Sequence, residues 1–375
     1  MRVGLVVPGF SADVDDWCIP ALRHLARALA RTDDVRVVAL RYPYRAARYA
    51  VEGASVIAVG GGDARRGAAL DVWRKTLELL LQEHRRQKFD VLHAFWATES
   101  GFLTAVAGRL LRVPTLVSLA GGELVALPTI GYGDQRAAAE RLKIHVSLRL
   151  ASTVSAGSHY LFRLAQRHVA SGRLRLAPLG VDLELFNPGP AAPASARRLI
   201  HVATLTPVKD QTTLLQAFRL VRKQVGDARL DIVGDGPLRL ELERLADELG
   251  LGDAVQFRGA IDHAALTAVY RTGSGFVLSS RHEAQGMVAI EAAACGIPVV
   301  GTRVGVIPEL ASAADAVAAV GAVEQLAAGL AITLESTDHR GERALELARR
   351  EFGLATCAAR FRDLYTHLTE PRGAP

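Results

Sequence analysis

The sequence has few cysteines and no long apolar run, and each scarcity excludes a class of protein. Cys18, Cys295 and Cys357 are the three cysteines among 375 residues, and they lie far apart. Their odd number and wide spacing suggest neither a disulfide framework nor a metal site, and they fit a reducing compartment. No segment reaches the ~18 uninterrupted apolar residues that a membrane-spanning helix requires. We therefore expect a cytoplasmic protein without a metal site.

Aromatic residues are also scarce, at 6%, and they are not interleaved with the basic residues, which argues against nucleic acid as a partner. The net charge is nevertheless +6, with local basic groups at 65–66, 85–88 and 197–198. Such groups are most often solvated helix faces. The alternative is attraction to anionic ligands or to an anionic membrane, which would place the protein peripherally at the inner face of that membrane.

Short β-branched runs alternate with helical patterns through the chain. Runs at 2–7 and 91–95 belong to the first half, and the alternation restarts at 199–203 and 229–233. Between the halves, residues 186–196 are rich in Pro and Ala and read as a linker. This pattern predicts an α/β protein with two doubly wound domains facing across a cleft. Ligands of such sheets bind beyond the carboxyl ends of the strands.

The most informative segment, residues 275–298, reads as an apolar strand, a polar loop and an apolar helix. Glu283 and Gly286 lie in the loop, and Glu291 follows Glu283 by eight positions. A helix N-terminus attracts phosphate through its free N–H groups and its dipole. Two acids at this spacing are ordinarily a solvated face, but this helix is too apolar to be exposed, and a buried carboxylate needs partners. A diphosphate with a sugar on each side fits the segment.

Three further strand ends carry polar residues. Lys209 follows one strand and precedes a helix, where its ammonium would supply a compact positive charge to a phosphate. The turn Gly234-Asp235-Gly236 follows another strand, and it is either a common turn or a place where the backbone approaches a ligand. Arg258 ends a third strand, where it would help to read a nucleobase or would simply close the strand.

Taken in order, these segments resemble the retaining glycosyltransferases of the GT-B fold, in particular the large family 4, over most of residues 90–310. The resemblance implies that Glu283 faces the donor sugar hydroxyls and Glu291 the nucleotide ribose. Backbone N–H groups of Gly286 and Met287 would hold the diphosphate. The donor-binding set is completed by Lys209, Gly234, Asp235, Gly236 and Arg258. The donor would be a nucleotide-diphosphate sugar, and no cofactor or metal is implied.

The resemblance also implies the division of the chain. The expected parts are an acceptor-side Rossmann-like domain (1–185), a linker (186–197), a nucleotide-sugar-binding Rossmann-like domain (198–350) and a C-terminal helix crossing back to the first domain (351–375).

The chain departs from the family pattern in three places. Thr204 stands where the family usually has an arginine five residues before the lysine. Ala120 stands in place of a histidine near the reacting centre, and Pro8-Gly9-Phe10 replaces the paired glycines of the first loop. One cation on the phosphates is therefore missing unless another residue supplies it, and the departures bear on acceptor chemistry more than on donor binding.

Two residues of the first half are candidates for the positioning role of the missing histidine. Glu123 follows two glycines after a strand, so it would accept a hydrogen bond from a sugar hydroxyl; the alternative is a helix-start cap. His93 lies near the end of another strand, and its alternative is a hydrogen-bonded structural histidine. With Glu283 and Lys209, these residues form the catalytic candidates.

The resemblance thus implies a metal-independent hexosyltransferase that retains configuration. The acceptor would be a glycan, a lipid or a small molecule. Two alternatives are a nucleotide-sugar-binding protein without transfer activity, suggested by Ala120 and Thr204, and a nucleotide-sugar epimerase, against which the acid pair argues.

Overall fold

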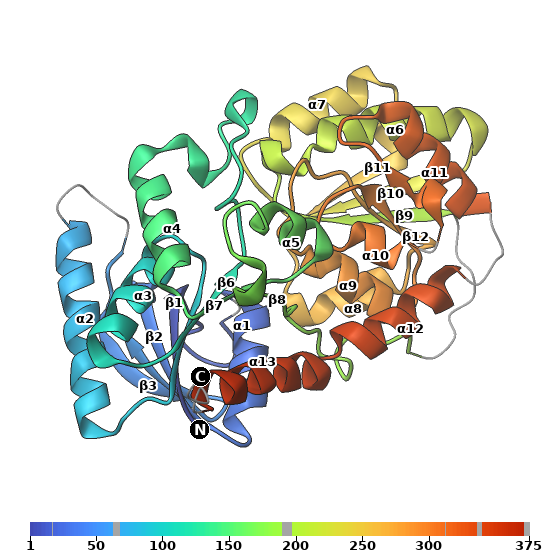
Figure 1. The fold of residues 1–375 in the computed structure, drawn as a ribbon. Coiled ribbons are helices and arrows are strands. Elements are labelled where there is room, and N and C mark those ends of the chain that lie inside the picture. The colour runs from blue at the N-terminus through green and yellow to red at the C-terminus, as the bar shows by residue number, and fades with distance from the viewer. Residues whose placement is uncertain (17, 63–67, 190–196, 312, 336–339, 371–375) are drawn as a thin grey trace. The chain divides into compact units, whose positions relative to one another are not determined.

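The computed structural model describes residues 1–16, 18–62, 68–189, 197–311, 313–335 and 340–370. These residues form two compact units. Unit 1 comprises Met1–Gly180 and the segment that begins at Leu354, and unit 2 comprises Val181–Gly353. Each unit is a sheet covered by helices (Figure 1).

Unit 1 contains an eight-stranded sheet in the order β3-β4-β2-β1-β5-β6-β7-β8. All neighbours are parallel except β3 and β4, which form an antiparallel pair. The strands are β1 (Arg2–Gly9), β2 (Asp34–Tyr42), β3 (Ala47–Val51), β4 (Ala54–Ala58), β5 (Val91–Phe95), β6 (Thr115–Leu119), β7 (Thr153–Ala156) and β8 (Leu174–Leu176). The helices are α1 (Pro20–Ala30), α2 (Ala68–Arg86), α3 (Glu99–Leu111), α4 (Ala138–Leu150), α5 (His159–Ala165) and α13 (Leu354–Thr369).

The core of unit 1 depends on the last helix of the chain. Phe361 and Tyr365 of α13 are fully buried in one apolar cluster with Leu25 of α1 and with Leu5 of β1. Because apolar residues recur at helical spacing on α13, one face of this helix packs on the sheet and the other faces solvent. The residues after 353 therefore complete the unit that the first 180 residues begin.

Unit 2 contains a six-stranded parallel sheet in the order β11-β10-β9-β12-β13-β14. The strands are β9 (Arg198–Val202), β10 (Arg229–Val233), β11 (Val255–Gly259), β12 (Gly275–Leu278), β13 (Val299–Thr302) and β14 (Val317–Ala318). The helices are α6 (Gln211–Gln224), α7 (Arg239–Glu248), α8 (Leu266–Tyr270), α9 (Met287–Ala294), α10 (Ile307–Leu310), α11 (Val323–Glu335) and α12 (Arg340–Phe352). This is the classic doubly wound order, whose direction reverses between β9 and β12.

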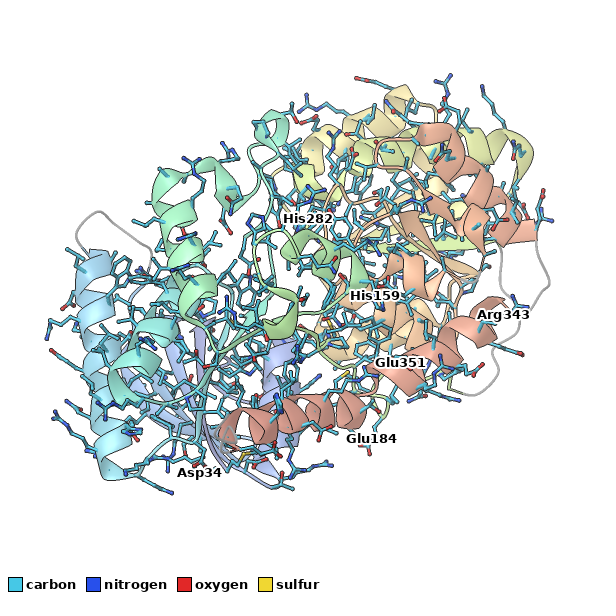
Figure 2. All side chains as sticks on the ribbon, viewed as in Figure 1. Asp34, His159, Glu184, His282, Arg343 and Glu351 are labelled. Carbon is cyan, nitrogen blue, oxygen red and sulfur yellow. The ribbon has the colours of Figure 1, made fainter. Side chains whose placement is uncertain are left out.

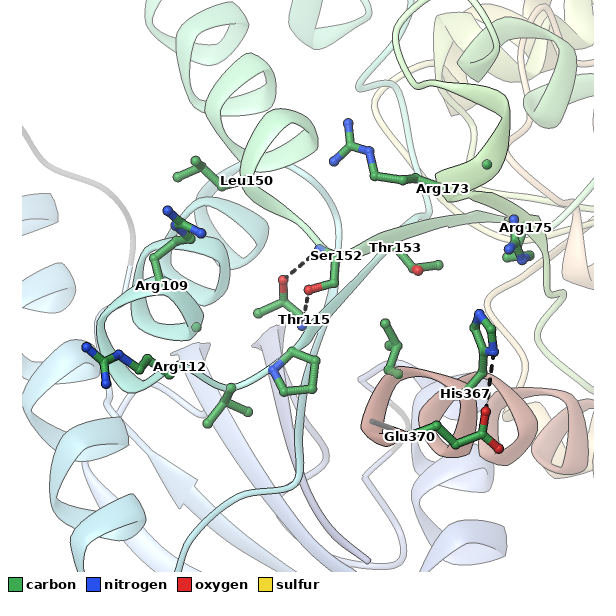
Figure 3. Close-up of a pocket in the computed structure, with 15 residues that line it drawn as sticks. Arg109, Arg112, Thr115, Leu150, Ser152, Thr153, Arg173, Arg175, His367 and Glu370 are labelled. Carbon is green, nitrogen blue, oxygen red and sulfur yellow. Dashed lines mark hydrogen bonds and ion pairs between the residues drawn. The ribbon is translucent and has the colours of Figure 1, made fainter. Parts of the chain in front are cut away.

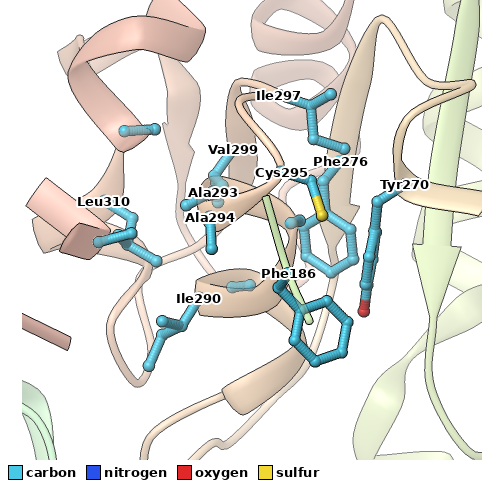
Figure 4. Close-up of a cluster of buried hydrophobic side chains, with 14 of the residues drawn as sticks. Phe186, Tyr270, Phe276, Ile290, Ala293, Ala294, Cys295, Ile297, Val299 and Leu310 are labelled. Carbon is cyan, nitrogen blue, oxygen red and sulfur yellow. The ribbon is translucent and has the colours of Figure 1, made fainter. Parts of the chain in front are cut away.

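Both faces of this sheet are buried, as its β-branched runs predict. On β12, Phe276 and Leu278 point into one cluster with α8, α9 and α12, and Val277 points into another with α6, α7 and α11. Figure 4 shows the first cluster, in which Phe186 and Tyr270 lie near the apolar helix α9. Helix α9 is buried along most of its length, so its position is fixed by packing.

The predicted α/β class with two parallel sheets is confirmed. The antiparallel β3–β4 pair was not foreseen. Of the predicted linker, residues 190–196 lie outside the described part of the chain. Its first residue, Phe186, is 1% exposed and packs against Tyr270, so the chain joins unit 2 before the linker begins. Within the described residues, no helix is both long and apolar enough to cross a bilayer.

Candidate functional site

Two loops of unit 2 meet where the strand order reverses. Lys209 ends a short 3-10 helix (Pro207–Lys209) after β9, and Glu283 lies in the loop after β12. Lys209 Nζ is 2.5 Å from Glu283 Oε1, and the hydroxyl of Ser280 donates to the same oxygen at 2.6 Å. In open α/β sheets this reversal is where ligands bind. The structure therefore brings together two of the predicted residues that lie 74 positions apart in the sequence.

The two loops are held together by their backbones as well. The backbone N–H of Arg281 donates to Val208 O at 2.7 Å, and the hydroxyl of Ser279 donates to Lys209 O at 2.8 Å. His282, labelled in Figure 2, is 2% exposed in the same loop. These contacts fix the position of the lysine relative to the carboxylate.

Helix α9 begins beside Glu283. Gly286 precedes the helix with φ 89°, a left-handed conformation that favours glycine. No side chain caps this helix start. The first backbone N–H groups of a helix have no partner within it, so Met287 and the next residues present donors with a positive dipole end. Lys209 and this helix start are the two groups of the site that favour an anion.

Glu291 lies on α9, and the structure gives each of its oxygens a partner. Oε1 is 3.0 Å from His263 Nε2, and Oε2 accepts a hydrogen bond from the Tyr270 hydroxyl at 3.0 Å. Burial, aided by the charge of Glu291, raises the pKa of Tyr270 well above its ordinary value, so Tyr270 stays protonated as a donor. The sequence reasoning missed His263 and Tyr270. Neither belongs to a motif, and only the fold brings them to the acid.

The glycine turn after β10 packs on the loop after β9. A Cβ on Gly234, whose φ is 127°, would lie 1.9 Å from Ala203 O, and one on Gly236 would lie 2.6 Å from Leu205 O. Asp235 is exposed and accepts a hydrogen bond from the N–H of Gly236 at 2.7 Å. These glycines therefore allow the two loops to touch, and so support the loop that leads to Lys209.

Arg258 of β11 reaches a buried acid. Its guanidinium lies 3.2 Å from Asp231 Oδ2, while Arg198 lies 2.7 Å from Asp231 Oδ1. Asp231 is 2% exposed, so these arginines compensate its charge. Arg258 thus pairs with a buried acid at the strand end, and its side chain remains 33% exposed.

A second buried network lies behind the Lys209 loop. His201 Nδ1 donates to Val277 O at 2.9 Å, and Gln211 Nε2 approaches His201 Nε2 at 3.2 Å and donates to Thr204 O at 3.0 Å. Burial lowers the pKa of His201 to about 4, so the ring is neutral. Thr204, which stands in place of the family's arginine, is thus held through its backbone. Its side chain supplies no cation to the site.

In unit 1, His93 lies in the core. It is fully buried, with Nδ1 2.7 Å from the Tyr365 hydroxyl and Nε2 2.7 Å from the Ser118 hydroxyl. Burial lowers its pKa to about 3, so the ring stays neutral in the folded protein. Both ring nitrogens have partners within the unit, so the structural alternative accounts for this histidine.

Glu123 is also fully buried. Its carboxylate accepts hydrogen bonds from the backbone N–H groups of Ala97 at 3.3 Å, Ala120 at 3.0 Å and Gly121 at 2.7 Å. Burial raises its pKa, and the backbone hydrogen bonds oppose this shift. Glu123 therefore joins the loops after β5 and β6 and shapes the segment that contains Ala120. The alternative of a helix-start cap also has a carboxylate accepting from backbone N–H groups, but here the N–H groups belong to loops.

Within the described residues, no group of three or more His, Cys, Asp or Glu side chains is arranged to hold a metal ion. The site of unit 2 offers one ammonium, one helix start and two carboxylates. It can bind an anion while accepting hydrogen bonds from hydroxyls.

Two family models match the chain. Residues 187–349 match "Glycosyl transferases group 1", and residues 19–180 match "Glycosyl transferase 4-like domain". Together they span nearly all of both units.

Curated relatives are similar over parts of the chain. A GDP-mannose-dependent alpha-(1-6)-phosphatidylinositol monomannoside mannosyltransferase of Mycolicibacterium smegmatis is 31% identical over 233 residues, which is 56% of this chain and 61% of the relative. The corresponding enzyme of Mycobacterium tuberculosis is 33% identical over 163 residues, or 39% of this chain and 42% of its own length. A D-inositol 3-phosphate glycosyltransferase of Thermobispora bispora is 28% identical over 76% of this chain and 74% of the relative.

Solved structures share the fold across nearly the whole chain. Sucrose-phosphate synthase from Thermosynechococcus elongatus has a TM-score of 0.78 at 22% identity, covering 98% of this chain and 99% of its own. HepE of Anabaena in complex with UDP and glucose has a TM-score of 0.75 at 18% identity, covering 98% of this chain and 100% of its own. At these identities the likeness establishes the fold, which is GT-B.

Proposed function

We propose that the chain, which is similar to GT-B glycosyltransferases, transfers a sugar from a nucleotide-diphosphate sugar to an acceptor, with retention of the anomeric configuration. The observation that carries the proposal is the contact of 2.5 Å between Lys209 and Glu283 at the reversal of the strand order, next to the start of α9. The same place holds an anion-binding pair of groups and a carboxylate that accepts hydroxyl hydrogen bonds.

The chemistry follows from the charges that develop in the reaction. Cleavage of the sugar–phosphate bond makes the anomeric carbon positive and the leaving diphosphate negative. Lys209 and the N–H groups at the start of α9 stabilise the negative charge, which lowers the barrier. Glu283 holds the sugar hydroxyls, and Glu291, oriented by Tyr270 and His263, holds the ribose. The acceptor attacks from the face that the diphosphate leaves, and the phosphate takes the acceptor proton. No step uses a metal.

The acceptor class is proposed from the relatives. Two of them are named for phosphatidylinositol mannoside and inositol phosphate acceptors, so a lipid or a phosphorylated small molecule is the first acceptor to try.

A second candidate function is nucleotide-sugar binding without transfer. The observation that favours it lies in unit 1, where His93 and Glu123 have their polar atoms bonded inside the core. Neither residue is therefore free to replace the histidine in whose place Ala120 stands.

One experiment separates the two candidates. The full chain is incubated with GDP-mannose and with UDP-glucose, each with and without inositol phosphate or phosphatidylinositol, and released nucleotide is measured. Transfer is expected with one donor, and NMR of the product should show the anomeric configuration of that donor. Inversion would contradict the mechanism. Binding of donor by calorimetry without release in any mixture would favour the second candidate.

A further inference from the structure

A basic cavity lies in unit 1 at the edge of the sheet opposite to the loops that contain Ala120 and Glu123. It has a volume of about 650 Å³. Its wall includes Thr115 and Thr153, the first residues of β6 and β7, so it opens at the amino ends of these strands. Glu123 follows the carboxyl end of β6, and neither Glu123 nor His93 lines this cavity, so the cavity is separate from the predicted site residues of the unit.

Four arginines line the cavity. Arg109 and Arg112 come from the end of α3, and Arg173 and Arg175 lie at the start of β8; Figure 3 shows the two pairs on opposite sides of the hollow. Arg173 donates to the backbone carbonyl of Ala151 at 2.7 Å, which fixes its guanidinium without neutralising it. Among the residues that the structure describes, none of the four forms an ion pair with a carboxylate.

Two exposed cations of α2 in the same unit are, by comparison, paired with acids. Arg74 lies 2.9 Å from Asp71 and 2.8 Å from Glu78, and Lys75 lies 2.6 Å from Asp71. In the cavity the single lining carboxylate is Glu370, which is 3.8 Å from His367. Four like charges around one hollow repel each other, and an anion among them would relieve that repulsion.

The floor of the cavity adds neutral groups. Ser152 Oγ accepts from the N–H of Thr115, and Thr115 Oγ1 accepts from the N–H of Ser152, both at 3.1 Å (Figure 3). Because each oxygen acts as an acceptor here, its hydroxyl proton can donate. A second hollow of about 310 Å³ shares Arg173 and adds Arg141, Arg149, His145 and His168, so the basic lining continues beyond the first cavity.

We propose that this cavity binds a phosphate-bearing ligand, through the guanidinium groups of Arg109, Arg112, Arg173 and Arg175. Guanidinium binds phosphate through two parallel hydrogen bonds, and the hydroxyls of Thr115 and Ser152 are suited to the remaining oxygens. The volume leaves room for a ligand larger than a single phosphate. The same chemistry is found in a soluble phosphate compound and in the headgroup of an anionic lipid.

The test uses two variants of the full chain that each remove two exposed positive charges. Arg109→Gln/Arg112→Gln alters the cavity, and Arg74→Gln/Lys75→Gln alters α2, where the cations are already paired with acids. Both are made together with Lys209→Ala, so that the proposed donor site does not contribute. Inorganic pyrophosphate is titrated by calorimetry, and phosphatidylcholine vesicles with one third phosphatidic acid are tested by co-sedimentation. Thermal unfolding verifies that both variants are folded.

Loss of pyrophosphate affinity by tenfold or more in the cavity variant, with the α2 variant unchanged, would support a soluble phosphate ligand. The same pattern confined to the vesicles would support a lipid headgroup. Equal losses in the two variants would show diffuse surface charge and overturn the proposal. Failure of both probes to bind the parent protein would overturn it as well.

Discussion

Lys209 and Glu283 each compensate the charge of the other, and both are mostly buried, with side-chain exposures of 21% and 11%. Such a pair is favourable only while both members are present, because a lone buried charge is costly. A diphosphate beside the start of α9 would offer Lys209 additional negative charge. Glu283 would then be free to accept hydrogen bonds from hydroxyls, so one ion pair serves both the resting site and the proposed complex.

Replacement of Lys209 tests this role directly. We expect Lys209→Ala to weaken binding of the cognate nucleoside diphosphate at least tenfold, about 1.4 kcal/mol, because one cation on the phosphates is lost. Calorimetry measures the affinity, and Lys223→Ala, an exposed lysine in the last turn of α6, is the matched control. Equal affinities in the two variants would show that the donor site lies elsewhere.

The buried histidines make stability depend on pH. His93 has a folded pKa of about 3 against an ordinary value of 6.5, so below pH 6.5 the unfolded chain binds a proton that the folded chain does not. Stability from His93 is therefore complete above pH 6.5 and is lost as the pH falls toward 3, by about 1.4 kcal/mol per pH unit. His201, with a pKa of about 4, acts in the same direction. Glu123, whose pKa burial raises, acts in the opposite direction.

The variant His93→Gln isolates the contribution of His93 to the pH dependence of stability. In His93→Gln, the free energy of unfolding should fall less steeply below pH 6.5 than in the parent, by about 1 kcal/mol per pH unit. Urea unfolding of the parent and of the variant at a series of pH values measures the two slopes. Parallel curves for the parent and His93→Gln would mean that His93 is not buried as described.

At the scale of elements, the contact between the loops after β9 and β10 is what places Lys209. The N–H of Leu205 donates to Asp235 O at 3.0 Å, and the N–H of Leu238 donates to Leu205 O at 3.1 Å. The two loops can approach each other this closely only because Gly234 and Gly236 have no side chain. The two loops are therefore packed directly on each other, so strain introduced in one is expected to reach the other.

Alanine at Gly234 should show this coupling. Its Cβ would collide with Ala203 O, and its φ of 127° is poor for alanine, so we expect a loss of more than about 2 kcal/mol in stability. Gly226→Ala is the control, because nothing lies within 4 Å of a Cβ there and its φ is ordinary. Thermal unfolding compares the two. If Gly234→Ala unfolded at the temperature of Gly226→Ala, the close approach of the loops would be contradicted.

These elements also show what a sequence can predict. The apolar residues around Glu291 predicted a buried helix, and the positions of Glu283 and Lys209 after strands predicted their meeting at one sheet edge, because parallel strands share that edge. The hydrogen-bond partners of Glu291 could not be predicted from the sequence. His263 and Tyr270 lie 28 and 21 positions before it and reach it through packing of α8 on α9, which no local pattern encodes. Glu123 follows β6 as predicted, whereas His93 lies within β5 rather than after it, and the burial of both depends on side chains from distant segments.

At the scale of the molecule, unit 1 is discontinuous, because the chain leaves it at Gly180 and returns at Leu354. Helix α13 contributes polar contacts to unit 1 as well as apolar ones. Its Tyr365 hydroxyl is 2.7 Å from His93 Nδ1, and its Arg362 is 3.1 Å from Asp33. The apolar clusters of unit 2 are built from residues 181–353 alone. Stability of the two units should therefore respond differently to loss of the last helix.

Truncation after Gly353 should unfold unit 1 and spare unit 2. Removal of Phe361 and Tyr365 alone deletes two fully buried aromatic side chains, each worth about 3–5 kcal/mol, which approaches the whole stability of a typical domain. Hydrogen exchange followed by mass spectrometry should show loss of protection in β1 and β5, with protection kept in β9 and β12. A chain that ends after Glu370 retains all of α13 and should match the full protein. Phe361→Leu, which keeps most of the apolar volume, should cost less than about 1.5 kcal/mol. Persistent protection of β1 and β5 in the chain that ends at Gly353 would mean that the first 180 residues form their core without α13.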